Sequence, residues 1–461
     1  MALRSLGSCV VCQKATVLGM MCRRMSAAAD LQPQVNFLKG QPHKKHPGVT
    51  KLKNLHLPDR LQTAALSIIQ GAQVSQLPEL TRSLTNFLWS RKRAVEDFTL
   101  KKKAQGLEKE LWEKAKESGV DIDGELLEER IRKKVLSELR RTTYHWTMMK
   151  YDEELGVVYM AARLAGGYAA VKRALNEIKK KDPSFAPQTL LDFGSGLGTV
   201  TWASHSYWGD TLKEMVCVDS SGQMNILAER LLKGDDENAE PHIKHVYFRQ
   251  FLPVSPKVQF DLVTAAFTLS ELPSRKQREE TVLTLWRKTN SYLVLVENGT
   301  KEGHQILMEA RETLLMTQDK VIHDPRPTSV FAPCPHELQC PKLAMKTIFP
   351  CNFQQLYHPL HLSKHKEQQT EEFSYLILTR GEPLKAKAEG VDWARLIAPV
   401  LRRSKHVHCR LCCADGQLQH LVVTANKHKI CTAALGAAIG EMRFPSFRKI
   451  KMTTTRLIDR D

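Results

Sequence analysis

A short apolar run followed by three alternating glycines constrains the fold of this chain more than any other stretch. It reads Gln-Thr-Leu-Leu-Asp-Phe-Gly-Ser-Gly-Leu-Gly-Thr over residues 188–199. Residues 189–193 have the length and apolarity of a strand buried on both faces, and a helix-like pattern resumes at Thr199. Glycines at a strand-to-helix turn let the backbone approach a ligand, and the helix N-terminus offers free N–H groups. The stretch predicts a nucleotide-cofactor turn; the plain alternative is a glycine-rich turn of any α/β protein.

The spacing of the glycines separates two classes of cofactor. The dinucleotide fingerprint G-x-G-x-x-G would need a glycine where the chain has Thr199. The pattern D-x-G-x-G-x-G is satisfied by Asp192, Gly194, Gly196 and Gly198. This spacing favours S-adenosylmethionine over NAD. A further acid, Asp219, ends a predicted strand over 214–219, where a carboxylate can accept both ribose hydroxyls of a nucleoside.

The residues around this turn repeat a strand-helix rhythm. Further strands are predicted at 246–251, 260–267 and 291–299, the last with a helix before and after it, and a late strand at 373–379. Strands that alternate with helices imply a parallel, doubly wound sheet.

The composition of the chain indicates which kinds of partner it can bind. With 461 residues, 42% of them hydrophobic, it can bury a large core in two or three domains, and no window is apolar enough to span a bilayer, so we expect no membrane insertion. The net charge of +18 makes nucleic acid the leading partner, because basic surfaces release counterions from phosphate backbones. A high positive charge predicts a surface that binds polyanions, but it does not indicate that the protein catalyses a reaction on them.

The first half of the chain divides into three segments. The first thirty residues contain several Ser and Ala and four cations, and no acid precedes Asp30. This composition predicts a mitochondrial transit peptide over residues 1–25 and a location in the matrix; a signal peptide or a disordered tail is the alternative. Residues 26–57 form a basic extended arm, either an RNA contact or a solvated linker. Residues 58–184 show helical periodicity and predict a helical N-terminal domain.

The apolar side chains that carry this helical periodicity are Leu80, Leu84, Phe87, Leu88, Leu126, Ile131, Val135 and Leu136. Cations lie between them, at Arg130, Arg132, Lys133, Lys134, Arg140 and Arg141, just before the aromatic stretch that ends at Trp146. These residues could lie on RNA phosphates with aromatic stacking nearby, or could form a solvated face.

Seven of the eleven cysteines follow residue 330. Cys334, Cys340 and Cys351 stand in proline-bracketed loops, and thiolates on such loops can converge on a soft metal. A fourth ligand could come from His336 or from the group Cys409, Cys412 and Cys413. A reducing matrix argues against disulfides. Spacing leaves zinc, an iron–sulfur cluster and incidental free cysteines open.

The glycine turn, Asp219 and the strand that begins at Phe260 together resemble a class I S-adenosylmethionine-dependent methyltransferase over about 185–380. The resemblance implies a seven-stranded, Rossmann-like α/β sheet with the cofactor over the glycine turn. Amino-methylating relatives carry an acceptor motif after the fourth strand, where this chain reads Thr-Leu-Ser-Glu-Leu-Pro over 268–273. Pro333-Cys334 matches the nucleophile dipeptide of cytosine methyltransferases but falls in the cysteine insertion. Catalytic residues are unknown, and whether the chain is an enzyme stays open.

The whole pattern resembles a mitochondrial family of ribosomal small-subunit methyltransferase-like proteins. It includes the Cys-Pro-His-Glu-Leu-Gln-Cys-Pro insertion, placed at 323–352, and the Cys-Arg-Leu-Cys-Cys-Ala-Asp-Gly stretch of a small β extension within 381–461. The resemblance implies a 4Fe-4S cluster, possible S-adenosylmethionine, and small-subunit rRNA and ribosomal proteins as partners of a monomer on the pre-ribosome. The cluster ligands that it implies are Cys334, Cys340, Cys351 and Cys412.

The sequence therefore predicts an RNA-binding assembly factor of the mitochondrial small ribosomal subunit with a methyltransferase fold. Two rival hypotheses belong to different classes: an active rRNA methyltransferase, and a zinc-dependent RNA-binding module with a vestigial sheet.

Overall fold

The computed structural model describes residues 50–424, except 51, 118–123, 145, 237, 256, 317–323, 325, 346–348, 361–367, 382–392 and 405. The expected transit peptide (1–25), most of the expected arm (26–57) and the tail beyond residue 424 lie outside these residues.

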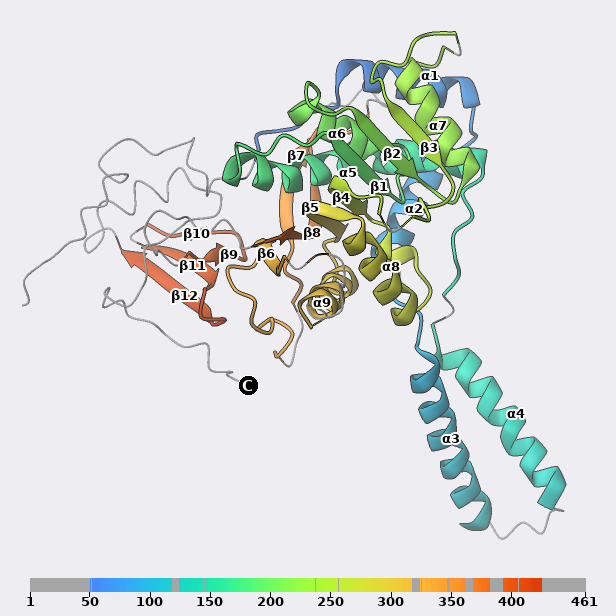
Figure 1. Ribbon diagram of the computed structural model, residues 1–461. Coiled ribbons are helices and arrows are strands. Elements are labelled where there is room, and N and C mark those ends of the chain that lie inside the picture. Colours follow the sequence, from blue (N-terminus) through green and yellow to red (C-terminus); the bar gives the residue numbers. More distant parts are fainter. Residues whose placement is uncertain are drawn as a thin grey trace, which may run out of the picture. The chain divides into compact units, whose positions relative to one another are not determined.

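The main sheet has eight strands in the order β3-β2-β1-β4-β5-β8-β6, with β7 also paired to β8 (Figure 1). The first five strands of the chain are mutually parallel: β1 (Thr189–Phe193), β2 (Glu214–Val218), β3 (Val246–Arg249), β4 (Phe260–Ala266) and β5 (Thr289–Asn298). Each lies where the sequence predicts a strand. The expected Rossmann-like α/β sheet is therefore confirmed, with the glycine turn directly after β1.

The remaining strands correct the expectation of an all-parallel sheet. β8 (Gln369–Arg380) runs antiparallel to β5, and β6 (Thr328–Ala332) and β7 (Phe353–Tyr357) run antiparallel to β8. β7 also raises the strand number from the expected seven to eight.

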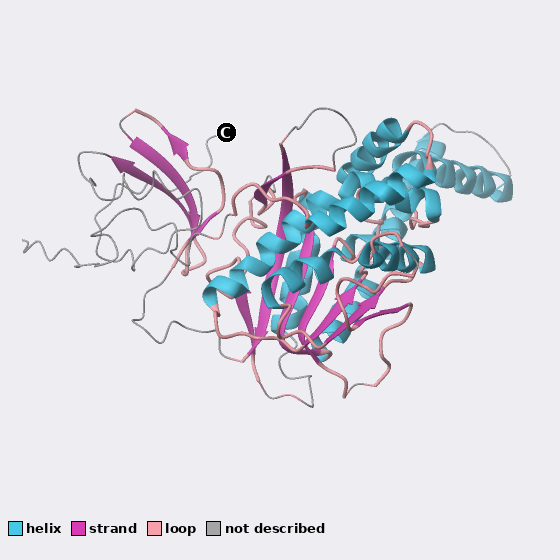
Figure 2. Ribbon diagram, turned by 90° about the horizontal axis from the view of Figure 1, so that it is seen from above, coloured by secondary structure: helices cyan, strands magenta, loops and turns pink. Residues whose placement is uncertain are grey.

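Successive side chains of the parallel strands point to opposite faces of the sheet and contribute to two hydrophobic cores. Leu190 and Leu262 face a core shared with four helices, whereas Leu191 and Val263 face a core shared with two. Helices lie along the strands in Figure 2. The first core receives α1 (Asp59–Ala72), α5 (Glu153–Lys181), α6 (Thr199–Trp208) and α7 (Gly222–Lys233), and the second receives α8 (Arg275–Arg287) and α9 (Lys301–Met316).

The helices expected over 58–184 are present, but they do not form a domain with a core of its own. α1 and α5 pack into the core of the sheet, and α5 buries most of its length there. The other three are α2 (Leu77–Ser90), α3 (Asp97–Glu117) and α4 (Gly124–Thr142). Figure 1 shows α3 and α4 side by side, and α3 has no buried residue.

Part of the predicted apolar stripe of these helices is solvent-exposed. Leu84, Ile131 and Val135 are buried as expected. The exposed members are Leu80, Phe87, Leu126 and Leu136. A pair of helices can bury only one narrow stripe of each partner, so the outer apolar positions stay in solvent.

The end of the expected arm is part of the fold rather than a free basic segment. The main chain of Leu55 pairs with Leu356 and His358 beside β7, with N–O distances of 3.0 and 2.8 Å. Thr50 is fully buried, and its carbonyl oxygen accepts a hydrogen bond from the Asn176 amide at 2.8 Å.

The expected C-terminal β extension is a second sheet of four strands: β9 (Arg395–Leu396), β10 (Leu401–Arg402), β11 (His406–Cys412) and β12 (Leu418–Thr424). Val407, Cys409 and Leu411 alternate on the buried face of β11 and form a small core with Leu421 of β12. Across the described ranges, no helix is long and apolar enough to cross a membrane.

Candidate functional site

The glycine turn (Gly194–Gly198) adopts the backbone conformation that its glycines permit. Gly194, Gly196 and Gly198 have φ angles of 69°, 50° and 71°, in the left-handed region that side chains rarely enter. The N–H groups of Gly194 and Ser195 both donate to the Val218 carbonyl oxygen, at 2.7 and 3.1 Å. The turn is thereby tied to the carboxyl end of β2, and α6 begins directly after Gly198.

Asp219 closes the turn from the end of β2. One carboxylate oxygen accepts a hydrogen bond from Gly196 N–H at 2.8 Å, and the other accepts one from Ser221 N–H at 2.9 Å. Burial raises the pKa of Asp219, and the two backbone hydrogen bonds partly offset this rise. The ribose contact assigned to Asp219 stays a prediction; the structure adds that this carboxylate holds the glycine turn in shape.

Asp192 is the polar residue of β1 that lacks a partner. It is fully buried, and neither carboxylate oxygen has a hydrogen-bond partner among the described residues. The hydroxyls of Ser195, in the turn, and of Thr264, the register neighbour of Asp192 on β4, are buried without partners as well. Burial, followed by the nearby charge of Asp219, raises the pKa of Asp192 well above its ordinary value.

These unpartnered oxygens decide whether the turn fits the implied cofactor. S-adenosylmethionine carries an ammonium group and two ribose hydroxyls, all of which donate hydrogen bonds, and buried acceptors without donors are costly. The unpartnered carboxylate of Asp192 therefore fits a ligand of this kind. Where such a cofactor binds, it supplies an activated methyl group.

The loop after β4 fills the space above the first glycine. A Cβ on Gly194 would lie 2.3 Å from side-chain atoms of Thr268. The Thr268 hydroxyl lies 3.1 Å from the Phe193 carbonyl oxygen, to which it donates a hydrogen bond. The preceding residue, Phe267, has a φ of 59°, unusual for a bulky side chain, and its ring faces Gly167 of α5.

A small cavity of about 30 Å³ lies beside this loop at the carboxyl ends of β4 and β5. Tyr151, Phe267, Glu271 and Glu297 line it, together with Arg163, whose guanidinium lies 5.0 Å from the centre of the Phe267 ring. Burial raises the pKa of Glu297 to about 7, and one of its oxygens has no partner in the described part of the chain. Sequence reasoning missed Glu297, although an acid that ends a buried strand is the signal used for Asp219.

Two segments cover this edge of the sheet: 91–96, between α2 and α3, and 146–152, between α4 and α5. Arg91 pairs with Glu271 at 2.5 Å and donates to the Thr147 carbonyl oxygen at 2.8 Å. The Ser221 hydroxyl donates to the Tyr151 carbonyl oxygen at 2.9 Å. These covering segments link the base of the α3–α4 pair to the loops after β2 and β4.

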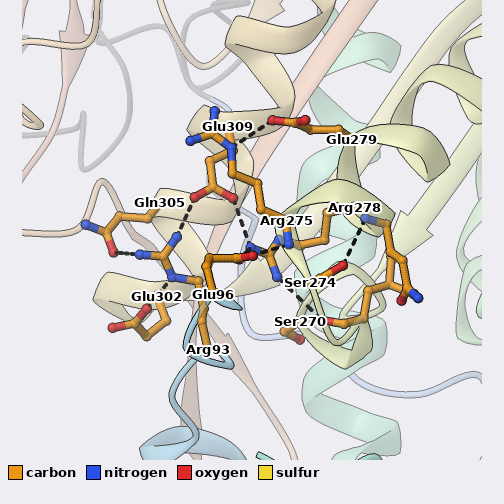
Figure 3. A network of polar contacts seen from close by, with 12 residues as sticks. Arg93, Glu96, Ser270, Ser274, Arg275, Arg278, Glu279, Glu302, Gln305 and Glu309 are labelled. Carbon is orange, nitrogen blue, oxygen red and sulfur yellow. Dashed lines mark hydrogen bonds and ion pairs between the residues drawn. The ribbon is translucent and has the colours of Figure 1, made fainter. Parts of the chain in front are cut away.

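Figure 3 shows the polar network that holds the first covering segment against α8 and α9. The Arg93 guanidinium lies between Glu302 at 2.7 Å, Gln305 at 2.9 Å and Glu309. Glu309 also pairs with Arg278, which lies 3.6 Å from Glu96. No pattern in the sequence predicts this network, because its members are scattered over more than 200 residues.

The four cysteines implied as cluster ligands line one cavity of about 20 Å³. Cys334 and Cys340 come from the loop after β6, Cys351 precedes β7, and Cys412 ends β11. These four residues are the cysteine pocket. Cys409 instead faces the core of the C-terminal sheet, and Cys413 packs against that core. All seven described cysteines are free of disulfides.

Two cysteines of the pocket, Cys340 and Cys412, are buried, and Cys334 and Cys351 are half-buried. Burial raises the pKa of Cys351 to about 12, and raises those of Cys334 and Cys412 as well. Nearby cations oppose this rise: Arg311 and Arg395 at Cys334, and Lys342 at Cys351. Thiolates are the metal-binding form, so these cations favour the state that binds metal. Within the described ranges, no three His, Cys, Asp or Glu side chains are grouped as the ligands of a single metal ion.

Two histidines border the pocket, and sequence reasoning named only one of them. His336 Nε2 lies 3.3 Å from the Cys412 sulfur, and His304 Nε2 lies 3.9 Å from the Cys340 sulfur. Burial, followed by the charge of Lys342, lowers the pKa of His304 to about 4, so its imidazole is neutral at pH 7. His304 belongs to α9, far from the cysteines in sequence, which is why their spacing could not reveal it.

Arginines hold the loops of the pocket in place. Arg311 of α9 donates to the carbonyl oxygens of His336 and Leu338, both at 2.9 Å. Arg395 of β9 donates to the Pro333 carbonyl oxygen at 2.7 Å. The Leu338 side chain packs against the β11–β12 turn, where a Cβ on Gly416 would meet it at 3.0 Å. The first two cysteines and the fourth are thus brought together by contacts outside the thiols.

The basic residues predicted for RNA contact on α4 are all exposed: Arg130, Arg132, Lys133, Lys134, Arg140 and Arg141. Two are engaged in ion pairs on the same helix, Lys133 with Glu129 and Arg141 with Glu138. The Arg91 guanidinium lies 5.1 Å from the centre of the Trp146 ring and occupies one of its faces.

Solved structures of similar fold include two methyltransferases. Magnesium protoporphyrin IX methyltransferase from Synechocystis PCC 6803 with bound SAH aligns with 53% of this chain and 94% of its own, at 12% identity and a TM-score of 0.30. A putative RNA methyltransferase from Pyrococcus horikoshii aligns with 46% of this chain and 84% of its own, at 10% identity and a TM-score of 0.28. Scores this low carry no argument, and the fold assignment rests on the strand order.

The sequence comparisons are more specific. The human mitochondrial ribosome assembly protein METTL17 is 52% identical over 392 residues, which cover 85% of this chain and 83% of that protein. A Schizosaccharomyces pombe protein, mitochondrial Rsm22-cox11 tandem protein 2, is 24% identical over 65% of this chain and 44% of its own length. The family model for the mitochondrial small ribosomal subunit protein Rsm22 matches residues 153–443. The chain therefore belongs to the Rsm22 family of mitochondrial small ribosomal subunit proteins.

Proposed function

We propose that this protein is an assembly factor of the mitochondrial small ribosomal subunit that binds its rRNA and carries a 4Fe-4S cluster in the cysteine pocket. The observation that carries the proposal is the convergence of Cys334, Cys340, Cys351 and Cys412 on one buried cavity. Family membership and the assembly role in the name of the human relative support the ribosomal part. The net charge of +18 supports the RNA part.

The donor set of the pocket suits an iron–sulfur cluster. Four cysteine thiolates are the usual ligands of such a cluster, and the protein tunes it through burial and nearby charge. Arg311, Arg395 and Lys342 would offset the negative charge of the thiolates. The cluster would join the β6–β7 loop to β11, so its binding free energy would contribute to folding of the C-terminal sheet.

The test of the cluster is spectroscopic and elemental. Anaerobically purified protein should show broad visible absorbance and bound iron, and Cys334→Ser or Cys340→Ser should abolish both. Cys413→Ser is the matched control, because Cys413 adjoins Cys412 but does not line the pocket, and it should keep its iron. Iron content unchanged by the first two substitutions would sink the assignment, and zinc in place of iron would establish the zinc-dependent module instead.

In this proposal the protein acts as a monomer on the pre-ribosome in the matrix, and the sheet serves as an RNA-binding scaffold. The covering segments support a scaffold role, because Arg91 and Arg93 hold them over the edge of the sheet where a methyl acceptor would enter. The loop that fills the space above Gly194 carries no acceptor motif.

The second candidate is an active S-adenosylmethionine-dependent rRNA methyltransferase. The unpartnered carboxylate of Asp192 beside the glycine turn favours it, because that carboxylate fits a ligand that donates hydrogen bonds. Asp192→Asn separates the two functions better than changes at the glycines, since it nearly preserves shape and breaks no hydrogen bond of the described residues. An enzyme should lose methylation of one rRNA nucleotide, whereas a scaffold should assemble subunits with unaltered rRNA methylation.

A further inference from the structure

The edge strand β3 presents a mixed aromatic and basic face to solvent. Val246 and Phe248 pack against the core, while Tyr247 and Arg249 alternate with them and are exposed. Beyond the strand, Phe251 is 80% exposed. β3 pairs with β2 along one side and is the last of the described strands in the sheet order, beside α7 in Figure 1. Its other edge therefore borders solvent.

An open groove of about 400 Å³ follows this edge. Its walls are Leu232 and Glu229 of α7, Pro241 and Ile243 of the following loop, and β3 itself. The cavities beside the glycine turn and within the cysteine pocket measure about 30 and 20 Å³. Only the groove at β3, of these three, is in the size range of small-molecule sites, and it combines apolar walls with a few polar groups as such sites do.

The charges at the groove favour a polyanion. Glu229 is paired with Lys233 at 3.1 Å, so the acid in the groove is already neutralised. Arg249 also lines the groove, and it has no ion pair within the described ranges. His245, exposed and with a φ of 62°, begins the same face, so an imidazole and a guanidinium flank Tyr247.

We propose that the β3 groove binds single-stranded RNA, with one base stacked on Tyr247 and the adjoining phosphate held by Arg249. Single-stranded RNA is recognised by aromatic platforms flanked by cations, and stacking accepts any base. The proposal rests on the RNA-binding function proposed above and names the surface and the form of RNA. A peptide added to the free edge as a further strand would use main-chain groups and would have no need of exposed Tyr247 and Arg249.

The test uses the full chain and a short fluorescent single-stranded RNA of mixed sequence, with the matching duplex as a second probe. Tyr247→Ala should weaken single-strand binding by about 5- to 100-fold, the range expected for losing one stacked base. Tyr247→Phe should bind like the unaltered protein, because the ring is kept. Arg249→Ala should lower the salt dependence of binding by about one phosphate contact. Duplex binding should change little in every variant.

Phe98→Ala is the control for loss of an exposed aromatic, since Phe98 is 76% exposed on α3. The location is read from RNA carrying 4-thiouridine, which should crosslink to residues 245–251. RNA binding with crosslinks only elsewhere would overturn this inference and leave the proposed function standing. No binding of either probe would overturn both. Crosslinks from this segment to a ribosomal protein instead of RNA would assign the groove to a peptide and end the proposal.

Discussion

At the scale of single residues, Gly194 shows how closely the glycine turn fits the loop after β4. Its φ of 69° and its approach to Thr268 leave no room for a Cβ. Glycine is therefore required here for two independent reasons, the backbone conformation and the packing. Gly196 meets only the first requirement, because the nearest atom to its added Cβ would be a Met224 methyl carbon at 3.6 Å.

Gly194→Ala should lower the free energy of unfolding by about 3 kcal/mol, the sum of left-handed strain and overpacking. Adding Thr268→Ala to Gly194→Ala should restore the part of the unfolding free energy that was lost to overpacking, because it removes the methyl and hydroxyl that the new Cβ meets. Chemical denaturation of both variants checks this. An unchanged midpoint for Gly194→Ala would contradict the geometry of the turn.

Glu297 should make the stability of the protein fall as the pH rises. Burial raises its pKa to about 7, above the ordinary glutamate value, so the folded state holds a proton that the unfolded state releases. The stabilising contribution is complete below about pH 4.5 and is lost as pH rises to about 7, at most about 3 kcal/mol. Glu297→Gln should therefore be more stable than the unaltered protein at about pH 8 and no more stable at about pH 5. Equal differences at the two pH values would show that Glu297 is charged throughout.

At the scale of elements, Arg395 joins the C-terminal sheet to the long helix α5. Its guanidinium donates to Glu177 at 3.1 Å and to the Pro333 carbonyl oxygen, and it is 1% exposed. Burial alone would raise the pKa of Glu177, but Arg395, Lys181 and Arg173 outweigh it and hold that pKa well below the ordinary value. One carboxylate thus gathers cations from α5 and β9.

Arg395→Ala should cost about 3 kcal/mol, at the low end for breaking a buried ion pair, because Glu177 keeps two other cations. The C-terminal sheet should then become the first site of limited proteolysis, and iron should be held less tightly. Arg403→Ala is the matched control, since Arg403 is exposed and directly follows β10 of the same sheet. Cleavage at the same rate in both variants would show that Arg395 does not hold the sheet.

At the scale of the whole molecule, the sequence predicts what is local and misses what is distant. The strands from β1 to β5 were predictable, because each is a short run rich in apolar residues, many of them β-branched or aromatic. β7 was not, since Phe-Gln-Gln-Leu-Tyr has no clear period and is a strand only because β8 pairs with it. The separate helical domain failed for the same reason: helical periodicity cannot tell which partner α5 covers.

The candidate site divides in the same way. The glycines, Asp192 and Asp219 follow from one motif, and the four pocket cysteines were named from a family pattern. Glu297, His304 and Arg395 were missed because burial and long-range contacts, not spacing, give them their role. The polar network of the first covering segment was missed for the same reason, since Arg93 and Glu309 are more than 200 residues apart in the chain.

Removal of metal should act on one part of the molecule. Treatment with a chelator and reductant should expose residues 393–424 to protease and leave the strands from β1 to β5 resistant, because the latter have cores of their own. Hydrogen exchange with and without iron measures this directly. Uniform loss of protection would mean that the cluster stabilises the entire fold.

The placement of Cys412 also bears on when the pocket can be completed. Three of its cysteines lie between residues 334 and 351, but the fourth follows some sixty residues later, near the end of the described chain. During synthesis and import from the N-terminus, the sheet and three thiols are present before the fourth arrives. A chain broken between residues 381 and 411 would keep β1 to β8, with the nucleotide-type turn and the groove, but could not close the pocket, so the pocket distinguishes chains that reach β11 from shorter ones.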